Sequence, residues 1–191
     1  YETVKAAYDE QFRITWLDST DVNDRNGLAI RTDVAQQYNI YTMSDLQREA
    51  EHIRVCSQGE FEYREDGIPG MTKVYGPFNF ASINVYDNGI KYQILEKGEA
   101  DLCPGYSTDA QLVNTDKFTY LEDDQGFWPP YYLAPIVRNE VLEANPEIAD
   151  ILNAVSAKLD TETMVSLNAK VDIDQMEYEE VAREFYETVC K

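Results

Sequence analysis

The feature that most constrains the fold is a regular alternation of strand and helix patterns between His52 and Tyr106. Three segments read as strands: "HIRVCS", "FASINVYD" and "ADLCPGYS". A Gly- and Pro-rich turn at 67–70 leads into a helix between the first two, and "NGIKYQILEKGE" predicts a second helix that ends at Gly98. Strands that alternate with helices form a parallel sheet covered by its crossover helices. The sequence therefore predicts an α/β fold.

The segments on either side of this unit predict a second lobe. Further strands are expected at 14–17, 27–31, "KFTYLED" and "YYLAPIVR", and further helices at 2–13, 32–38 and 42–51. The remaining tail is helical, and the side chains expected on inner helix faces are Ile148, Ile151, Leu152, Val155, Tyr178, Val181, Ala182, Phe185 and Val189. We expect two interleaved lobes, with 1–25 and 107–191 in lobe one and 26–106 in lobe two, so that the chain crosses near 26 and near 106.

The composition excludes several classes of protein. The chain carries 16 Lys and Arg against 36 Asp and Glu, a net charge of −20, and a surface of that sign repels nucleic acids and anionic lipids. No apolar run reaches the roughly 18 residues that a membrane-spanning helix needs. One histidine, His52, and three cysteines without CxxC spacing supply neither a zinc site nor Ser-His-Asp chemistry. We expect no metal, no cofactor and no nucleic-acid partner.

Two of the 14 tyrosines are candidates for ligand binding. Tyr106 and Tyr131 lie in turn-like segments at the ends of predicted strands, where open α/β sheets and interlobe clefts hold ligands. Ring faces carry partial negative charge and attract a quaternary ammonium by ~0.5 to 2 kcal/mol per ring. The alternative is that both rings only pack between the lobes, and spacing alone favours that alternative.

Charged candidates have a similar ambiguity. Arg64, just before the glycine-rich turn, could grip a carboxylate through two parallel hydrogen bonds, or could form a surface ion pair with Glu65 or Asp66. Asp123 and Asp124 could do general acid–base chemistry, although a chain with 36 acids contains such pairs by chance.

The cysteines allow two interpretations. Cys56 and Cys103 lie at matching ends of neighbouring predicted strands, where either a disulfide or two buried thiols could form. Cys190 has no evident partner in the tail.

Five ordered motifs resemble a known family. They occupy residues 15–46, 60–76, 86–102, 105–111 and 121–142, and include "EFEYREDGIPGMTKVYG", "GYSTDAQ" and "GFWPPYYLAP". Together they resemble the substrate-binding proteins of osmoprotectant ABC importers, the glycine betaine/carnitine/choline-binding family. The resemblance covers nearly the whole chain. It implies a two-lobed, periplasmic-binding-protein-like (type II) fold, with each lobe a mostly parallel sheet flanked by helices.

The resemblance also implies roles for single residues. Tyr106 and Tyr131 match the family's cage tyrosines, Arg64 matches the arginine that binds the ligand carboxylate, and Asp24 matches a contact position. Asn26 stands where the family usually has another cage ring, so one wall of the box is an amide here. The two prolines before Tyr131 would hold its ring in one pose, whereas Trp128 and Tyr132 are expected to pack the lobe or the hinge.

The expected function follows from this resemblance. The chain would capture a small quaternary-ammonium zwitterion outside the cytoplasm, without catalysis, and its closed form would dock on ABC permease subunits. Members of the family usually carry a further N-terminal stretch of about half this chain's length, so lobe one is expected to be partial. Two alternatives remain: an acidic hydrolase that uses Asp123 and Asp124, and a ligand-sensing domain of a receptor or permease fusion.

Overall fold

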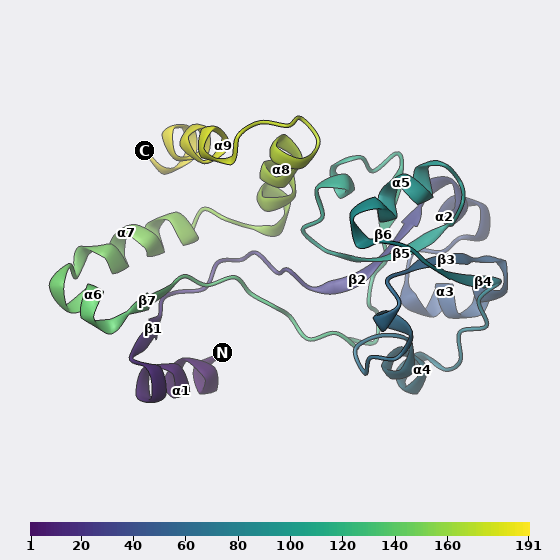
Figure 1. Ribbon diagram of the computed structural model, residues 1–191, viewed down its shortest axis with the longest axis horizontal. Coiled ribbons are helices and arrows are strands. Elements are labelled where there is room, and N and C mark those ends of the chain that lie inside the picture. The colour runs from purple at the N-terminus through teal and green to yellow at the C-terminus, as the bar shows by residue number, and fades with distance from the viewer. The chain divides into compact units, whose positions relative to one another are not determined.

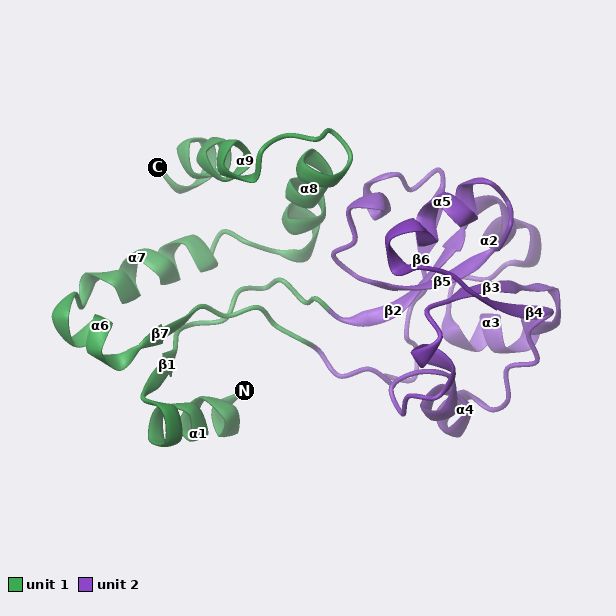
Figure 2. Ribbon diagram, viewed as in Figure 1, with its two compact units in different colours: residues 1–24, 131–191 green, residues 25–130 purple.

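A computed structural model describes all 191 residues of the chain, in two compact units. Unit 1 contains residues 1–24 and 131–191, and unit 2 contains residues 25–130 (Figure 2). Each unit has its own sheet and its own helices (Figure 1). None of the helices is both long enough and apolar enough to cross a bilayer.

Unit 2 is built on a five-stranded sheet with the order β4-β3-β5-β2-β6. β3 pairs in parallel with both β4 and β5, whereas β2 pairs antiparallel with β5 and β6. The strands are β2 (Asn26–Arg31), β3 (Arg54–Ser57), β4 (Ser82–Val85), β5 (Leu102–Tyr106) and β6 (Phe118–Tyr120). The predicted βαβαβ unit is confirmed as β3-α4-β4-α5-β5. The expected mostly parallel sheet is instead mixed, because β2 joins β5 and β6 in antiparallel pairing.

Helices connect these strands, and capping residues determine where two of the helices begin or end. The helices are α2 (Thr32–Tyr38), α3 (Met43–Glu49), α4 (Ile68–Tyr75) and α5 (Lys91–Glu96), with short 3₁₀ turns at Ala50–His52, Glu60–Glu62, Asn88–Ile90 and Ala110–Val113. Thr42 caps α3, since its side chain accepts from Asp45 N while the Asp45 carboxylate accepts from Thr42 N. Gly98, at φ +70°, supplies the left-handed residue just beyond α5.

The chain leaves unit 2 later than the sequence analysis predicts. We expected the second crossing near 106, but residues 107–130 belong to unit 2 and the boundary lies between Pro130 and Tyr131. The reason is β6, which returns to the free edge of β2, and Leu121 N then donates to Leu28 O at 2.9 Å. Period-2 patterns identify a strand, but they do not identify its neighbour.

Two apolar clusters cover opposite faces of this sheet. Leu28 and Ile30 belong to the first cluster, with Val55 and Leu102, whereas Ala29 between them belongs to the second. Because successive strand residues point to opposite faces, this alternation shows that both faces are buried. Unit 2 is therefore a sheet between two layers of helix and loop.

The cysteines are free thiols. Cys56 and Cys103 are fully buried in the second cluster, on neighbouring strands, and Cys190 is partly exposed in the tail. Burial raises the pKa of the Cys56 thiol to about 11 and raises that of Cys103 further above its usual range. Both groups are therefore protonated near neutral pH and pack as small apolar side chains.

Unit 1 has a smaller sheet and a largely helical tail. β1 (Ile14–Trp16) pairs antiparallel with β7 (Ile136–Arg138). The helices are α1 (Glu2–Phe12), α6 (Asn139–Ala144), α7 (Glu147–Ser156), α8 (Thr161–Asp172) and α9 (Tyr178–Phe185), which continues as a π-helical turn, Tyr186–Cys190.

Several inner-face predictions for this tail are wrong. Val181 of α9 is buried at 4% exposure, but Tyr178 is 67% exposed and Val189 is 46% exposed. On α7, Ile151 is 56% exposed. Helical spacing groups these side chains on one face, but a face becomes buried only where another element covers it.

We expect amide hydrogen exchange to be slowest in unit 2. The amides of Leu28 and Ile30 belong to β2, an inner strand of a five-stranded sheet, and the side chains of both residues are 0% exposed. The two-stranded sheet of unit 1 has no fully buried residue. Exchange measured by mass spectrometry should show β2 and β5 protected longest and β1 and β7 exchanging earlier. Equal protection in the two sheets would contradict this reading.

Candidate functional site

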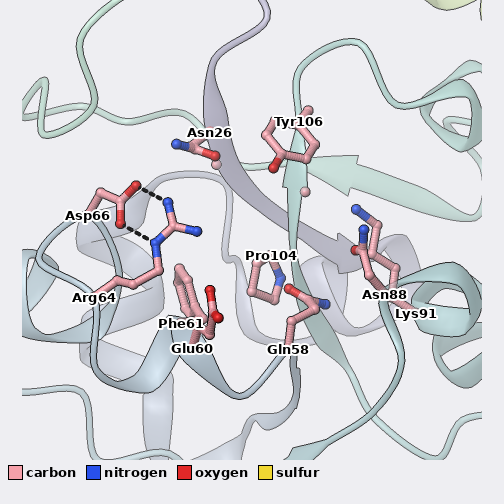
Figure 3. A pocket seen from close by; sticks show the side chains of 12 residues that line it. Asn26, Gln58, Glu60, Phe61, Arg64, Asp66, Asn88, Lys91, Pro104 and Tyr106 are labelled. Carbon is pink, nitrogen blue, oxygen red and sulfur yellow. Dashed lines mark hydrogen bonds and ion pairs between the residues drawn. The ribbon is translucent and has the colours of Figure 1, made fainter.

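Unit 2 contains a cavity of about 200 Å³ at the strand ends where Tyr106 closes β5. Its lining includes three of the predicted site residues, Asn26, Arg64 and Tyr106. Figure 3 shows Asn26 and Tyr106 on one side of the cavity, Arg64 on a second side, and Gln58, Asn88 and Lys91 on a third. The carboxyl ends of β3 and β5 meet there, which is the usual place for a ligand in an open α/β sheet.

Strand pairing places Asn26 beside Tyr106. The two residues are directly opposite in the antiparallel β2–β5 ladder, and Gly27 is opposite Gly105 in the next pair. Directly opposite side chains share one face of a sheet, with Cβ atoms roughly 5 Å apart. The amide wall expected from Asn26 therefore adjoins the ring of Tyr106, which is 42% exposed.

Steric crowding explains why position 27 is a glycine. A Cβ atom added there would lie 2.1 Å from the hydroxyl oxygen of Tyr120, far inside contact distance. That hydroxyl lies 3.1 Å from Asn26 O and 3.2 Å from Arg25 O, to which it can donate. Glycine thus lets Tyr120 brace the first residues of β2.

The loop that carries Arg64 is tightly packed. Added Cβ atoms would lie 2.1 Å from Phe61 O at Gly67 and 1.9 Å from Glu65 O at Gly70. Trp128, only 3% exposed, donates from Nε1 to Asp66 O at 2.8 Å. The prediction that Trp128 packs the lobe is confirmed, whereas Tyr132 is 52% exposed.

Arg64 already has a carboxylate partner. Its Nε donates to Asp66 Oδ1 at 2.8 Å and its Nη2 donates to Asp66 Oδ2. These bonds lower the pKa of Asp66, although its burial opposes the shift, and they raise the pKa of Arg64. The surface ion pair considered for Arg64 therefore exists, but Nη1 points away from Asp66 (Figure 3) and Arg64 also lines the cavity.

Lys91 is a site residue to which the sequence analysis gave no role. It is 7% exposed, and its Nζ lies 2.9 Å from Asp109 Oδ2, 5.2 Å from the ring centroid of Tyr92 and 5.5 Å from that of Tyr106. The available signal was its position as the first residue of a crossover helix, because such residues lie at the carboxyl edge of a parallel sheet.

Asp109 forms an ion pair with Lys91 and accepts hydrogen bonds from two neighbouring residues. Its Oδ2 accepts from the hydroxyl of Tyr92 at 2.7 Å and from Tyr106 N at 3.1 Å. A Cβ atom at Gly105 would lie 2.8 Å from the same oxygen. The turn "STD" is therefore more than a helix cap, because its aspartate fixes both the buried ammonium group and the backbone of Tyr106.

The remaining predicted site residues belong to unit 1. Asp24 N donates to Tyr131 O at 2.9 Å, and Tyr131 N donates to Asn23 Oδ1 at 2.8 Å. Asn23 N in turn donates to Thr161 Oγ1 at 3.0 Å. The backbone of Tyr131 is thus held on both sides, and its side chain is 47% exposed. The structure groups Asp24 with Tyr131, and groups Asn26 and Arg64 with Tyr106.

The two carboxylates of the hydrolase alternative have structural partners. Asp123, 9% exposed, accepts from Tyr75 Oη at 2.5 Å, Phe127 N at 3.0 Å and Trp128 N at 2.9 Å. Asp124 accepts from Ser44 N at 3.1 Å and from Ser44 Oγ at 2.6 Å. Burial raises the pKa of Asp124, but these bonds from Ser44 outweigh burial and hold the pKa below its usual value. Neither group lines the cavity.

The carboxyl group of Asp66 should stay ionised at lower pH than an ordinary aspartate does. Its folded-state pKa lies below the usual 3.8 because of Arg64, so the pair stabilises the fold above that value and the contribution is lost as the pH falls through the lowered pKa. A carboxyl ¹³C titration should give a midpoint below 3.8 for Asp66, and Arg64→Gln should raise it. An unchanged midpoint in that variant would show that Arg64 does not cause the shift.

Asp123→Ala should destabilise the fold by about 1–3 kcal/mol, because two backbone amides and a hydroxyl lose their buried acceptor. Asp116→Ala is the matched control, since Asp116 is an exposed aspartate of the same unit and should change stability by less than about 0.5 kcal/mol. Urea unfolding followed by tryptophan fluorescence measures both. Equal midpoints would contradict a structural role for Asp123.

Comparisons with known proteins agree with this architecture. The family model for the substrate-binding domain of ABC-type glycine betaine transport systems matches residues 1–188. A Helicobacter pylori protein named ergothioneine transport permease/ergothioneine binding protein is 32% identical over 98% of this chain and 34% of its own length. A glycine-betaine-binding protein of Pseudomonas aeruginosa is 35% identical over 97% of this chain and 62% of its own length.

Solved structures show the same fold. The crystal structure of a glycine betaine/carnitine/choline ABC transporter protein superposes with a TM-score of 0.88 at 29% identity, over 97% of this chain and 68% of that one. Lactococcal OpuAC with glycine betaine gives a TM-score of 0.61 at 14% identity, which bears on the fold alone. The fold is the two-lobed type II α/β fold of periplasmic binding proteins, and the chain spans 34% to 63% of the length of the curated relatives named for ergothioneine, carnitine and glycine betaine. The chain belongs to the family of substrate-binding domains of ABC-type glycine betaine transport systems.

Proposed function

We propose that this chain is the ligand-capturing part of an ABC importer and binds a small quaternary-ammonium zwitterion. The observation that carries the proposal is the shared cavity of Tyr106, Asn26 and Arg64, in a chain of this family. The cavity joins an aromatic face to a cationic side chain, and a zwitterion presents the complementary pair of charges. Relatives named for glycine betaine, carnitine and ergothioneine support the ligand class.

Tyr106 is proposed to take the cationic end of the ligand. A trimethylammonium group cannot donate a hydrogen bond, and a ring face attracts it electrostatically once water is displaced. Asp109 fixes the backbone of Tyr106 through Tyr106 N, so the ring starts from an ordered position. Pre-ordering lowers the entropy lost on binding.

Arg64 is proposed to take the carboxylate of the ligand. Asp66 engages Nε and Nη2, and the free Nη1 edge carries further N–H donors. A second carboxylate can therefore approach Arg64 without breaking the pair. Asp66 keeps Arg64 in place at the cost of part of its positive charge, so the contact is weaker than one to an unpaired arginine.

Asp24 and Tyr131, both in unit 1, are proposed as further ligand contacts. The double proline and the hydrogen bonds to Asn23 and Asp24 fix the backbone of Tyr131, and its ring is exposed enough to receive a ligand. Ligand capture would shift an equilibrium between open and closed forms, and the closed form would dock on permease subunits outside the cytoplasm.

Asn26 is proposed to make the site weaker for a bare cation. An amide next to Tyr106 offers hydrogen bonds to a polar ligand but lacks the ring face that the family usually has there. The preferred ligand would then carry polar groups that Asn26 can reach.

The alternatives are less well supported. A hydrolase based on Asp123 and Asp124 would need two free carboxylates in a cavity, and both serve as acceptors within the fold. A ligand-sensing domain of a receptor or permease fusion would keep the same cavity and would differ in the domains attached to it. The full-length sequence separates that alternative from an importer subunit.

Calorimetry on the natural full-length protein tests the proposal. Glycine betaine, carnitine or ergothioneine should bind in the micromolar range, and Tyr106→Ala or Tyr131→Ala should weaken binding by about 2- to 30-fold, the equivalent of ~0.5 to 2 kcal/mol. Tyr41→Ala and Tyr186→Ala are matched controls, because these tyrosines have similar exposure, 49% and 47%, and do not line the cavity. No binding across the panel would remove this ligand class.

A further inference from the structure

We propose that Lys91, together with Gln58, makes this cavity select ligands that carry a carboxylate and discriminate against ligands that carry only a positive charge. The inference rests on the proposed function and deepens it. It concerns the side of the cavity opposite Arg64, where Gln58, Asn88 and Lys91 lie (Figure 3).

The first observation is that a buried cation shares the ring that the ligand would use. Lys91 Nζ lies 5.5 Å from the centroid of Tyr106, inside the range of a cation–π contact. A second cation that approaches the same ring meets weakened attraction from its π-face and direct repulsion from Lys91. Since the lysine is only 7% exposed, water screens this repulsion poorly.

The second observation is an unpaired donor on the same side. Nε2 of Gln58 is buried and has no hydrogen-bond partner, although Gln58 lines the cavity. A buried N–H group without an acceptor is costly, and a ligand oxygen would satisfy it. A carboxylate placed between Gln58 and Lys91 would gain one hydrogen bond and one charge contact.

The third observation is that Lys91 is held in place. Asp109 lies 2.9 Å from its Nζ and is itself bonded to Tyr92 and to the backbone of Tyr106. Asp109 neutralises part of the charge, so the expected effect is moderate. The ammonium group of Lys91 nevertheless keeps a fixed position 5.5 Å from the ring centroid of Tyr106.

The consequence is that the cavity favours zwitterions and disfavours ligands that carry only a positive charge. A trimethylammonium zwitterion can put its cationic end on a ring and turn its carboxylate toward Lys91 and Gln58. This pose replaces the contact of that carboxylate with Arg64, which lies on the opposite side of the cavity. Choline has the same cationic end and a hydroxyl in place of the carboxylate, so it meets the repulsion without the compensating contact.

The test is a set of dissociation constants measured by calorimetry on the natural full-length protein. The ligands are glycine betaine, carnitine, ergothioneine and choline, and the variants are Lys91→Gln, Lys91→Arg, Gln58→Leu and the control Lys97→Gln. Lys97 is an exposed lysine directly after the same helix. The unaltered protein should prefer the zwitterion that it binds best over choline by at least about tenfold.

Lys91→Gln should raise the dissociation constant of that zwitterion by about three- to tenfold and lower the dissociation constant of choline by a similar factor. Lys91→Arg should keep the original preference, Gln58→Leu should weaken only the zwitterion, and Lys97→Gln should change neither. Because Lys91→Gln leaves the half-buried Asp109 beside a neutral group, the double variant Lys91→Gln/Asp109→Asn serves as a second test if the single variant unfolds. It should also lose the preference for the zwitterion.

The outcomes separate the two proposals. Equal weakening of both ligand types by Lys91→Gln, or an unchanged ratio in it and in the double variant, would overturn the role of Lys91 and leave the proposed function intact. Tighter binding of choline than of every zwitterion by the unaltered protein would overturn the role of Lys91 and also the zwitterion assigned in the proposed function. Failure of all four ligands to bind the unaltered protein would overturn the proposed function, and the inference with it.

Discussion

The antiparallel pairing of β2 with β5 is the constraint on which the candidate site depends. It brings Asn26 next to Tyr106, although 79 residues separate them in the chain, and it aligns Gly27 with Gly105 directly below. Both glycines are needed because side-chain oxygens come within 3 Å of where a Cβ would be, from Tyr120 at Gly27 and from Asp109 at Gly105. A shift of one residue in this register would turn Tyr106 to the other face of the sheet and would separate Asp109 from Lys91. The cavity is therefore a product of backbone pairing before it is a product of side-chain choice.

The sequence predicts the elements of unit 2 well and their pairing less well. Alternating strand and helix patterns between His52 and Tyr106 are local, and local patterns are what periodicity reports. The return of β6 to β2 involves residues about 90 apart, and nothing in "KFTYLED" states which edge it will join. The same limit explains Tyr178 and Ile151, whose helical spacing is correct but whose faces are not covered. Pairing partners and covering layers are properties of the whole chain, which a window of residues does not contain.

For the site, the sequence identifies candidate residues, and the structure identifies their interaction partners. Arg64 could be read as an ion-pair partner or as a ligand contact, and both readings remain, because it bonds Asp66 and also lines the cavity. Asp123 and Asp124 looked like a pair from their adjacency, yet their partners lie on different elements, the Trp128 segment and the start of α3. The sequence predicts no role for Lys91, because a single lysine at the start of a helix forms no recognisable pattern. Its importance comes from Asp109 and Tyr106, which are distant in sequence.

The charges of the whole chain and the charges of the cavity act on a ligand in different ways. The chain carries a net charge of −20, which would attract any small cation without regard to its shape. Inside the cavity each cation has its own carboxylate, Asp66 beside Arg64 and Asp109 beside Lys91. Glu60 also lines the cavity, so the lining together with Asp109 keeps a net negative charge, and the paired charges add strong local fields that alternate over a few ångströms. A ligand with one charge gains at one position and loses at the next, whereas a ligand with two opposite charges at the right separation gains at both. Net charge would then speed the encounter, and the paired charges would decide which ligand stays.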